Sequence, residues 1–359
     1  MSRFEAEDIE AVSIPFTLGV VMAALLPLEG ESFFLPALCC SAGLVPLCLV
    51  LCRQGKSTLP LLVLFSLLGF LAYCNASICG PGRLPRSPLA EKAVQGFSAM
   101  IDSVGFEKEN TRTLLKALLT GNKAPLGEQT IEVFRRSGAS HILALSGLHL
   151  GVIYGILSKA LSVLGNSRSM AVLRSLLIVA VAAFYVLMTG ASASIIRAFL
   201  FICVNEAAAH STGRRRAPLS TFCIALTLQL SFNPLAIKTV GFQLSYLAML
   251  GILTVYQQLE KWYPGDNRHS LLRAVWKSMA LSVSCQCFTA PPVWWRFHTF
   301  PRYFLLTNLL ALPLTELLIV FALFCIGTGA LGICPQITKN VCDYLADILI
   351  ECLGIISSL

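Results

Sequence analysis

The sequence predicts an all-α protein that crosses a membrane repeatedly, and three observations support this fold class. Of the 359 residues, 56% are hydrophobic and only 13% are charged, whereas soluble proteins carry roughly 25% charged residues. The mean hydropathy is +0.74. Apolar runs of about 20 residues, the length that crosses a bilayer as a helix, recur along the chain. We therefore expect a polytopic transmembrane helical protein with about ten spans and additional amphipathic helices at the membrane surface.

The apolar runs locate the expected spans. They lie near residues 13–28, 32–51, 59–76, 139–163, 171–189, 194–209, 218–232, 240–257, 274–290 and 302–331. The first run follows an acidic start and leads into further spans, so we interpret it as a membrane helix and not as a cleavable signal peptide. Residues 340–358 differ, because Asp343, Asp347 and Glu351 recur four positions apart. This spacing gives a helix with one acidic stripe, which is typical of a helix that lies in the interface.

Basic residues indicate the orientation of the spans. They gather in four short loops, at residues 52–57, 165–170, 211–218 and 261–273. The predicted spans place all four loops on the same side, and short loops rich in Lys and Arg stay in the cytoplasm. The N-terminus is therefore predicted to be cytoplasmic. The connections predicted to lie outside are 28–32, 233–240 and 290–302.

Residues 80–136 form the one long segment without membrane character. The segment begins with the breaker "GPGRLPRSP". Two stretches follow, 89–106 and 107–122, whose apolar residues recur three and four positions apart as in amphipathic helices. The segment is thin for an independent core, so we prefer a helical collar on the external membrane face to a separate domain. The chain then divides into N-terminal transmembrane helices (1–80), an external amphipathic segment (81–110) and a transmembrane core (111–359).

The stretch "SGASHILALSGLHLG" (137–151) places polar residues in an apolar run. If it is one helix, His141, Ser146 and His149 share a broad arc, because successive residues advance by about 100°. Polar groups in hydrocarbon are unfavourable unless they face water or a hydrogen-bonding partner. Two interpretations remain open, a water-filled path and polar contacts between helices. A ridge on another side, which lets a second helix approach closely, is formed by Gly147, Gly151 and Gly155.

Other spans also supply polar groups. Ser194 and Arg197 lie in "MTGASASIIRAFLF". The Arg197 side chain either extends to the membrane surface or faces the interior as a cation for a phosphate or carboxylate. Gln243 and Asn308 lie inside two further spans. Pro313, close to Asn308, predicts a broken helix, a feature that lines binding sites in transporters.

The predicted outer loop "PPVWWRFHTFPRYF" (291–304) alternates aromatic and basic side chains. One interpretation is an aromatic belt at the membrane interface. The other is an entrance loop for DNA, because the bases of a single strand stack on aromatic rings while Arg contacts the strand. The residues that this second interpretation assigns to DNA are Trp294, Trp295, Arg296, Phe297 and Arg302.

We expect no metal and no cofactor. Most of the fourteen cysteines lie inside apolar runs, where cysteine behaves as a small hydrophobe. Cys285 and Cys287 are two positions apart, which is not the CxxC spacing of zinc and redox sites. No HExxH motif occurs. A disulfide between Cys74 and Cys79, which flank the first block of spans, is left open.

The segment "SHILALSGLHLG" (140–151) resembles the signature of the ComEC/Rec2 family of competence proteins, which is close to "SHLLAISGLHVG". The resemblance continues in order along the chain. "LLKALLTGNKAPLGEQTIEVFRRSG" precedes the segment, and "MTGASASIIRAFLF", "GFQLSYLAMLGI" and "NLLALPL" follow it. The resemblance covers residues 110–330 approximately, so we interpret 111–359 as a competence-type transmembrane core.

The resemblance implies an inner-membrane channel component, not an enzyme, that takes up single-stranded DNA during natural transformation. Its implied partners are single-stranded DNA and membrane lipid, with a DNA receptor, a nuclease and a cytoplasmic motor as separate proteins. A homo-oligomer is left open. The residues on the family's recurring polar positions, which we expect in the pathway or the polar core, are His141, Ser146, His149, Ser194, Arg197, Gln243 and Asn308.

The sequence also departs from the family. Fuller members carry an external OB-like domain and a metallo-β-lactamase-like domain that is thought to degrade the strand that is not transported. No HxHxDH motif occurs here, and residues 80–136 are too few for an OB-like domain. Two other functions remain open. One is a small-solute secondary transporter, and the other is an intramembrane enzyme with His141 or His149 as general base beside Ser146.

Overall fold

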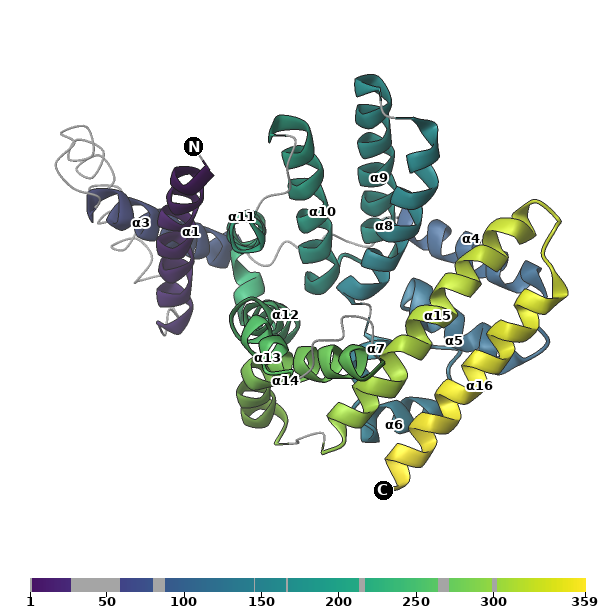
Figure 1. Ribbon diagram of the computed structural model, residues 1–359. Coiled ribbons are helices and arrows are strands. Elements are labelled where there is room, and N and C mark those ends of the chain that lie inside the picture. The colour runs from purple at the N-terminus through teal and green to yellow at the C-terminus, as the bar shows by residue number, and fades with distance from the viewer. Residues whose placement is uncertain are drawn as a thin grey trace. The chain divides into compact units, whose positions relative to one another are not determined.

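The computed structural model is helical in every regular element of the residues that it describes (Figure 1). These residues are 2–26, 59–79, 88–144, 146–165, 167–212, 217–263, 271–298 and 302–359. The span predicted at 32–51 lies outside them. The all-α fold class is confirmed.

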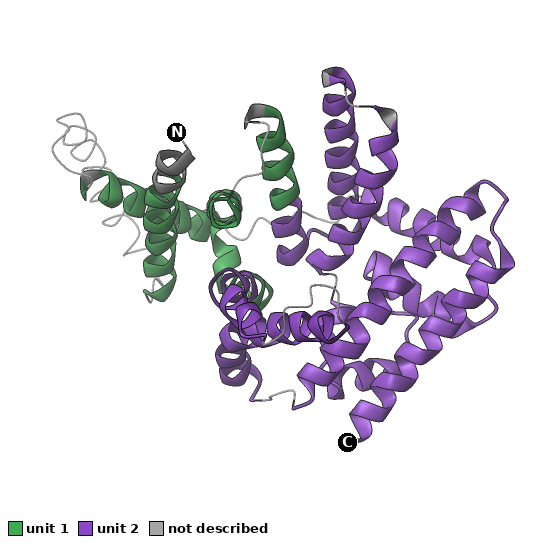
Figure 2. Cartoon of the chain, in the orientation of Figure 1, with its two compact units in different colours: residues 1–85, 200–246 green, residues 86–199, 247–359 purple. Residues whose placement is uncertain are grey.

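The chain separates by packing into two compact units (Figure 2). Unit 1 comprises residues 1–85 and 200–246, and unit 2 comprises residues 86–199 and 247–359. The boundary expected at residue 110 lies inside helix α5 (Glu109–Thr120). The three-part division by membrane topology stays a prediction.

Unit 1 is built on a close crossing of two apolar helices. Its elements are α1 (Ser2–Leu25), α3 (Leu59–Cys79), α11 (Pro218–Phe232), the 3-10 turn η2 (Pro234–Lys238) and adjoining parts of α10 (Ala193–Thr212) and α12 (Val240–Gly251). Gly19 of α1 faces the carbonyl group of Ser66, and Gly69 of α3 faces that of Phe16. A side chain at either glycine would overlap the carbonyl oxygen. The glycines therefore allow direct contact between the two backbones.

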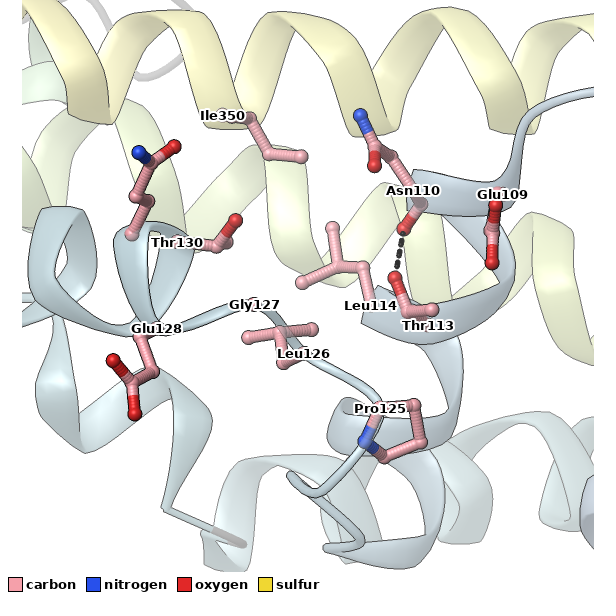
Figure 3. A pocket seen from close by; sticks show the side chains of 11 residues that line it. Glu109, Asn110, Thr113, Leu114, Pro125, Leu126, Gly127, Glu128, Thr130 and Ile350 are labelled. Atoms are coloured by element: carbon pink, nitrogen blue, oxygen red, sulfur yellow. Dashed lines mark hydrogen bonds between the residues drawn. The ribbon is translucent and has the colours of Figure 1, made fainter.

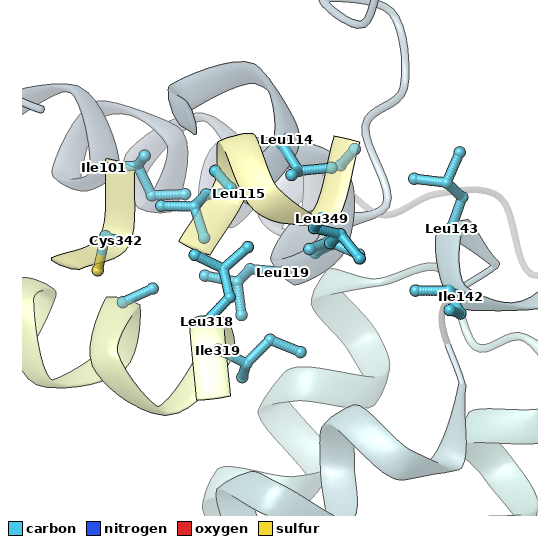
Figure 4. Packing of buried hydrophobic residues seen from close by; sticks show 14 of the residues in the cluster. Ile101, Leu114, Leu115, Leu119, Ile142, Leu143, Leu318, Ile319, Cys342 and Leu349 are labelled. Carbon is cyan, nitrogen blue, oxygen red and sulfur yellow. The ribbon is translucent and has the colours of Figure 1, made fainter. Parts of the chain in front are cut away.

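Unit 2 contains a large hydrophobic core (Figure 4). Its elements are α4 (Pro88–Val104), α5, α6 (Glu128–Arg136), α7 (Ser140–Leu143), α8 (Gly147–Leu161), the 3-10 turn η1 (Ser162–Leu164), α9 (Arg168–Met188), the start of α10, the π-helical turn η3 (Ile252–Tyr256), α13 (Gln257–Lys261), α14 (Leu271–Phe297), α15 (Phe304–Ala330) and α16 (Gln336–Ser358). Leu115 of α5, Leu318 of α15 and Leu349 of α16 are fully buried in this core. The apolar faces predicted for the amphipathic helices before residue 122 are thus covered by α15 and α16.

The segment from α4 to α6 is attached to both ends of α15. Near the start of α15, Thr307 Oγ1 donates a buried hydrogen bond of 2.6 Å to the carbonyl oxygen of Ser137. Near its end, a Cβ placed at Gly329 would lie 3.3 Å from a methyl group of Val104. These contacts are about 33 Å apart along the helix axis, at 1.5 Å per residue. The position of this segment at the external membrane face stays a prediction, but its helices pack along the length of α15.

The acidic stripe of α16 faces protein at two of its three positions. Asp343 Oδ2 accepts the backbone N–H of Glu107 at 3.2 Å, and the ammonium group of Lys108 pairs with Asp347. The hydrogen bond from Asp347 raises the pKa of Lys108 above its usual value. The stripe therefore joins α16 to the connection between α4 and α5, and the position of this helix in the membrane interface stays a prediction.

The described residues contain several helices that fit a bilayer. Five are long and apolar enough to cross it, within Leu61–Ile78, Ser169–Met188, Ala193–His210, Val240–Lys261 and Phe304–Ala330. Three shorter apolar helices are Ile9–Leu25, Gly147–Leu161 and Pro218–Phe232. The span predicted at 274–290 lies within the longer helix α14. The membrane character of the fold is confirmed by these helices.

Helix α15 continues through Pro313, where the sequence predicts a break. The helix runs without interruption from Phe304 to Ala330. Pro313 lies on the exposed side of α15, so the backbone bond that proline removes is lost where it does not disturb the core. The prediction of a broken helix at this position is wrong. An interruption lies instead between α7 and α8.

Candidate functional site

Helix α8 begins with a reciprocal cap made by Ser146 and His149. The stretch predicted as one helix ends at Leu143 and starts again at Gly147, with Ser146 extended as the N-cap residue (φ −105°, ψ 161°). The Ser146 side chain accepts the backbone N–H of His149. In return, His149 Nδ1 accepts the backbone N–H of Ser146 at 3.1 Å. These bonds satisfy two amides that a helix start otherwise leaves unpaired.

The cap fixes the orientation and the tautomer of the His149 ring. Since Nδ1 accepts a hydrogen bond, the neutral imidazole carries its proton on Nε2. The residue is only 1% exposed. Its Nε2 atom is buried and has no hydrogen-bond partner among the described residues. A buried N–H donor of this kind is a place where a water molecule or a ligand group is expected.

The first turns of α8 and α10 lie side by side at Gly147. A Cβ placed at Gly147 would be 3.1 Å from the Cβ of Ala198, 3.5 Å from Nη2 of Arg197 and 3.6 Å from the carbonyl oxygen of Ser194. At Gly151 and Gly155 no atom of another described helix comes within 4 Å of such a Cβ. The predicted glycine ridge therefore forms a close helix contact at its first position only.

The guanidinium group of Arg197 lies against protein in unit 2. Its Nη2 atom is beside the N-terminus of α8, as the contact with Gly147 shows. A helix N-terminus carries a partial positive charge of about half an elementary charge. The two adjoining positive groups favour an anion at this place.

We call this region the α8–α10 junction and define it by Ser146, Gly147, His149, Ser192, Ser194 and Arg197. Ser192 precedes α10, and its backbone carbonyl accepts the amides of Ile195 and Ile196. Its hydroxyl group is buried and has no hydrogen-bond partner among the described residues. Sequence reasoning missed Ser192, although its position immediately before the start of α10 is typical of residues that cap a helix.

The structure leaves two of the predicted polar residues outside this junction and does not place a third within it. His141 is exposed on α7, where its Nδ1 lies 3.1 Å from the carbonyl oxygen of Gly138. Gln243 belongs to unit 1, is exposed, and donates from Nε2 to the carbonyl oxygen of Ile237 at 2.9 Å. Asn308 lies in the first turns of α15 with a buried side-chain oxygen that has no hydrogen-bond partner among the described residues. The single arc predicted for His141 and His149 is wrong, because the helix between them is interrupted.

The predicted entrance loop is mostly helical. Residues 291–297 complete α14, and the remaining described connection to α15 consists of residues 298, 302 and 303. Trp294, Trp295 and Phe297 remain 58%, 85% and 53% exposed. Arg296 and Arg302 are exposed as well. The loop assignment is therefore wrong for 291–297, whereas the exposure that stacking requires is present.

A cavity of about 390 Å³ lies elsewhere in unit 2, between the first turns of α5 and α6 and the middle of α16 (Figure 3). Glu109 and Glu128 supply carboxylates, and Leu114, Leu126 and Ile350 supply apolar surface. It shares no residue with the α8–α10 junction. This cavity is not predicted from the sequence, because Ile350 comes from a segment far from α5 and α6 in the chain.

Two further predictions concern metal binding and a disulfide. No group of three or more His, Cys, Asp or Glu side chains there is placed to hold a metal ion. Cys74 is a buried free thiol. The Cys79 side chain lies outside the described residues, so a disulfide between Cys74 and Cys79 is not tested.

The family model of the competence proteins matches residues 118–359. The chain belongs to this family. The match includes the whole α8–α10 junction, α14, α15 and α16, and it begins near the end of α5. The polar signature from which the sequence resemblance was drawn thus coincides with the interrupted helix.

Named relatives agree with this family. The chain is 26% identical over 222 residues to ComE operon protein 3 of Bacillus subtilis, 27% over 232 residues to Recombination protein 2 of Haemophilus influenzae, and 30% over 179 residues to Competence protein ComA of Neisseria gonorrhoeae. The alignments cover 61%, 60% and 47% of this chain but only 26%, 29% and 25% of these family members. The chain therefore matches little more than a quarter of their length. No solved structure matches the chain.

Proposed function

We propose that this chain is an inner-membrane channel component through which single-stranded DNA enters the cytoplasm during natural transformation. The match of residues 118–359 to the competence protein family is the observation that carries the proposal. The names of the relatives, which refer to competence and recombination, support it.

The chemistry of the described residues suits such a cargo. A single strand of DNA is a dense anion, so its path needs spaced cations and flat aromatic surfaces instead of one tight site. Arg197 beside the start of α8 supplies a cation within unit 2. The exposed end of α14 supplies Trp294, Trp295 and Arg296.

The proposal includes a location and partners. We place the chain in the bacterial inner membrane as a multi-pass protein with a cytoplasmic N-terminus, as the basic loops predict. Its role is transport and not catalysis. As the sequence resemblance implies, we also propose that a DNA receptor, a nuclease and a cytoplasmic motor act with it as separate proteins. Whether the chain forms a homo-oligomer is left open, and its mass measured in detergent decides this.

The interruption between α7 and α8 favours one alternative, a secondary transporter for a small anion. Discontinuous helices in transporters direct their N-termini at anionic groups of the substrate. The start of α8 has this arrangement, with Arg197 beside it. The family match favours DNA over a small solute, and the experiment below separates the two.

A deletion strain tests the proposal. Transformation by added DNA is measured separately from arrival of the DNA in the periplasm, with the gene restored in trans as the control. We expect transformation to be lost while arrival continues. Normal transformation in the deletion strain rules out the DNA-uptake role and leaves the small-anion transporter, which an uptake screen with labelled anions then examines.

A further inference from the structure

At the start of α8, backbone amides and a guanidinium group lie close together. The amides of Gly147 and Leu148 are the first two of the helix and have no intrahelical acceptor. The guanidinium group of Arg197 lies beside Gly147, with Nη2 3.5 Å from the position of a Cβ there. By standard backbone dimensions, no more than about 6 Å then separates Nη2 from the Gly147 amide nitrogen.

His149 provides an observation that is independent of the helix terminus. Its Nδ1 is bonded to the backbone of Ser146 at the cap, so the ring stands against the first turn of α8. The opposite nitrogen, Nε2, is a buried donor that lacks a partner among the described residues, in a side chain that is 1% exposed. The hydroxyl group of Ser192, which precedes α10, is also buried and has no hydrogen-bond partner among the described residues. Buried polar groups are rarely left in this state.

We propose that the α8–α10 junction binds one phosphate group. During DNA uptake this group is a phosphodiester of the transported strand. One phosphate oxygen accepts from the guanidinium group of Arg197, and a second accepts from the free amides at the start of α8. The Nε2–H group of His149 donates to the same anion. The identification of DNA as the source of the phosphate rests on the proposed function. The geometry of the phosphate site does not depend on that function.

The spacing of the donors suits a phosphate. Charge-assisted hydrogen bonds to such oxygens are about 2.7–2.9 Å long. A tetrahedral group can therefore bridge two donors that are about 6 Å apart or less, with one oxygen directed to each. One such site along a path holds a passing strand only weakly, because affinity for a nucleic acid grows with the number of phosphate contacts.

The first experiment measures binding of a fluorescent single-stranded oligonucleotide to the purified full chain in phosphatidylcholine nanodiscs. Anisotropy titrations are repeated over a series of salt concentrations. We expect Arg197→Gln to lower the affinity roughly tenfold and to reduce the slope of log K against log salt by about 0.7, the value for one contact on a single strand. The matched control is Arg136→Gln, which removes the same charge from an exposed residue of α6 that pairs with Glu132.

Three results of this titration decide the proposal. We expect Arg197→Lys, which keeps the charge, to retain the wild-type slope while losing part of the affinity, because the forked donor is absent. An affinity and a slope in Arg197→Gln that equal those of the wild type would overturn the proposal. An equal loss in Arg136→Gln would also overturn it, because the effect would then reflect net charge alone.

The second experiment uses the unmutated chain and so does not depend on the folding of a variant. Phenylglyoxal modifies accessible arginines, and mass spectrometry reports the modification of Arg197. We expect inorganic phosphate and the oligonucleotide each to protect Arg197 in phosphatidylcholine nanodiscs. Protection that appears only when phosphatidylglycerol is present would identify a lipid headgroup as the source and overturn the assignment to DNA. No protection under any condition would overturn the site.

Failure of this inference is distinguishable from failure of the proposed function. If the deletion strain loses transformation but phosphate does not protect Arg197, the DNA-uptake role stands and the phosphate site is wrong. If phosphate protects Arg197 but the deletion strain transforms normally, the site stands and its cargo is another phosphate-bearing molecule.

Discussion

The imidazole of His149 closes a helix cap, which explains why a histidine is present in such an apolar run. Ser146 and His149 satisfy each other's backbone amides at the start of α8. An unpaired amide in a dry interior is unfavourable by about 1–3 kcal/mol, so the pair stabilises an interruption that hydrocarbon otherwise disfavours. The same bonds leave Nε2–H as a buried donor that has no partner among the described residues.

The cap predicts that Ser146→Ala destabilises the protein. The hydroxyl group that accepts the amide of His149 is lost, and the loss of a cap residue costs about 0.5–2 kcal/mol. Thermal unfolding in detergent, followed by circular dichroism, measures the effect. The control is Ser162→Ala, because Ser162 is an exposed residue that donates to the carbonyl oxygen of Lys159 and caps no helix start. Equal stabilities of the two variants would contradict the role of the cap.

Gly147 and Gly151 provide a second test at the scale of single residues. In a helix, Gly→Ala stabilises by about 1 kcal/mol when space is available. At Gly151 no atom lies within 4 Å of the new methyl group, whereas at Gly147 it meets the Cβ of Ala198 at 3.1 Å. We expect Gly151→Ala to keep transformation at the wild-type level and raise the unfolding temperature. Gly147→Ala should lower transformation, measured with a selectable marker, because α8 and the guanidinium group of Arg197 must move apart. A wild-type transformation frequency in Gly147→Ala would mean that the close contact is not needed.

At the scale of elements, periodicity predicted most helices but not their interruptions. The apolar pattern continues across Leu143 and Leu148, so one helix fits the sequence as well as two. The signal for the break was Ser146 three residues before His149, and it is weak because histidine replaces the usual acidic partner of a cap. At Pro313 the sequence predicted an interruption that the structure does not have, because the exposed position of this residue on α15 could not be inferred from the sequence. Pro291 and Pro292 likewise lie inside α14 instead of starting a loop.

The core of unit 2 predicts a contrast between neighbouring leucines of α15. Leu318 is fully buried among side chains of α5 and α16, whereas Leu317 is 48% exposed. Leu318→Ala leaves a cavity and should lower the free energy of unfolding by about 2–5 kcal/mol. Leu317→Ala removes the same atoms from an open position and should change it by about 0.5 kcal/mol or less. Unfolding in mixed micelles measures both variants. Similar losses would show that α15 does not pack against α5 and α16 as described.

The ion pairs of the same unit predict how stability depends on pH. Hydrogen bonds from Arg136 and Arg135 lower the pKa of Glu132 on α6. A carboxyl group with a lowered folded-state pKa stabilises the fold above its unfolded pKa of about 4.3 and loses this effect as the pH falls through the folded value. Glu132→Gln should therefore reduce stability slightly at neutral pH and not at all at strongly acidic pH. Denaturation midpoints at the two pH values measure this, and a difference that persists in acid would contradict it.

At the scale of the whole molecule, the sequence indicated candidate polar residues but did not indicate which of them lie close together. His149, the guanidinium group of Arg197 and the backbone carbonyl of Ser194 lie at the start of α8, and their role in a shared polar interior stays a prediction. His141 lies before the helix interruption, and Gln243 belongs to unit 1, so the structure does not place either residue at the start of α8. Which residues of different helices meet depends on packing between segments that are far apart in the chain. A single sequence contains no direct record of that packing.

The proposed path for DNA needs more than one point of contact, and we propose the exposed end of α14 as the second. Trp295 is 85% exposed, and stacking of one base on an aromatic ring contributes about 1–3 kcal/mol. Trp295→Ala should therefore weaken oligonucleotide binding about fivefold or more, measured by anisotropy in phosphatidylcholine nanodiscs. Trp262→Ala is the matched control, since Trp262 is 70% exposed after α13 and belongs to no predicted path. If Trp295 instead belongs to an aromatic belt, its removal will lower insertion into the membrane and leave the affinity for the oligonucleotide unchanged.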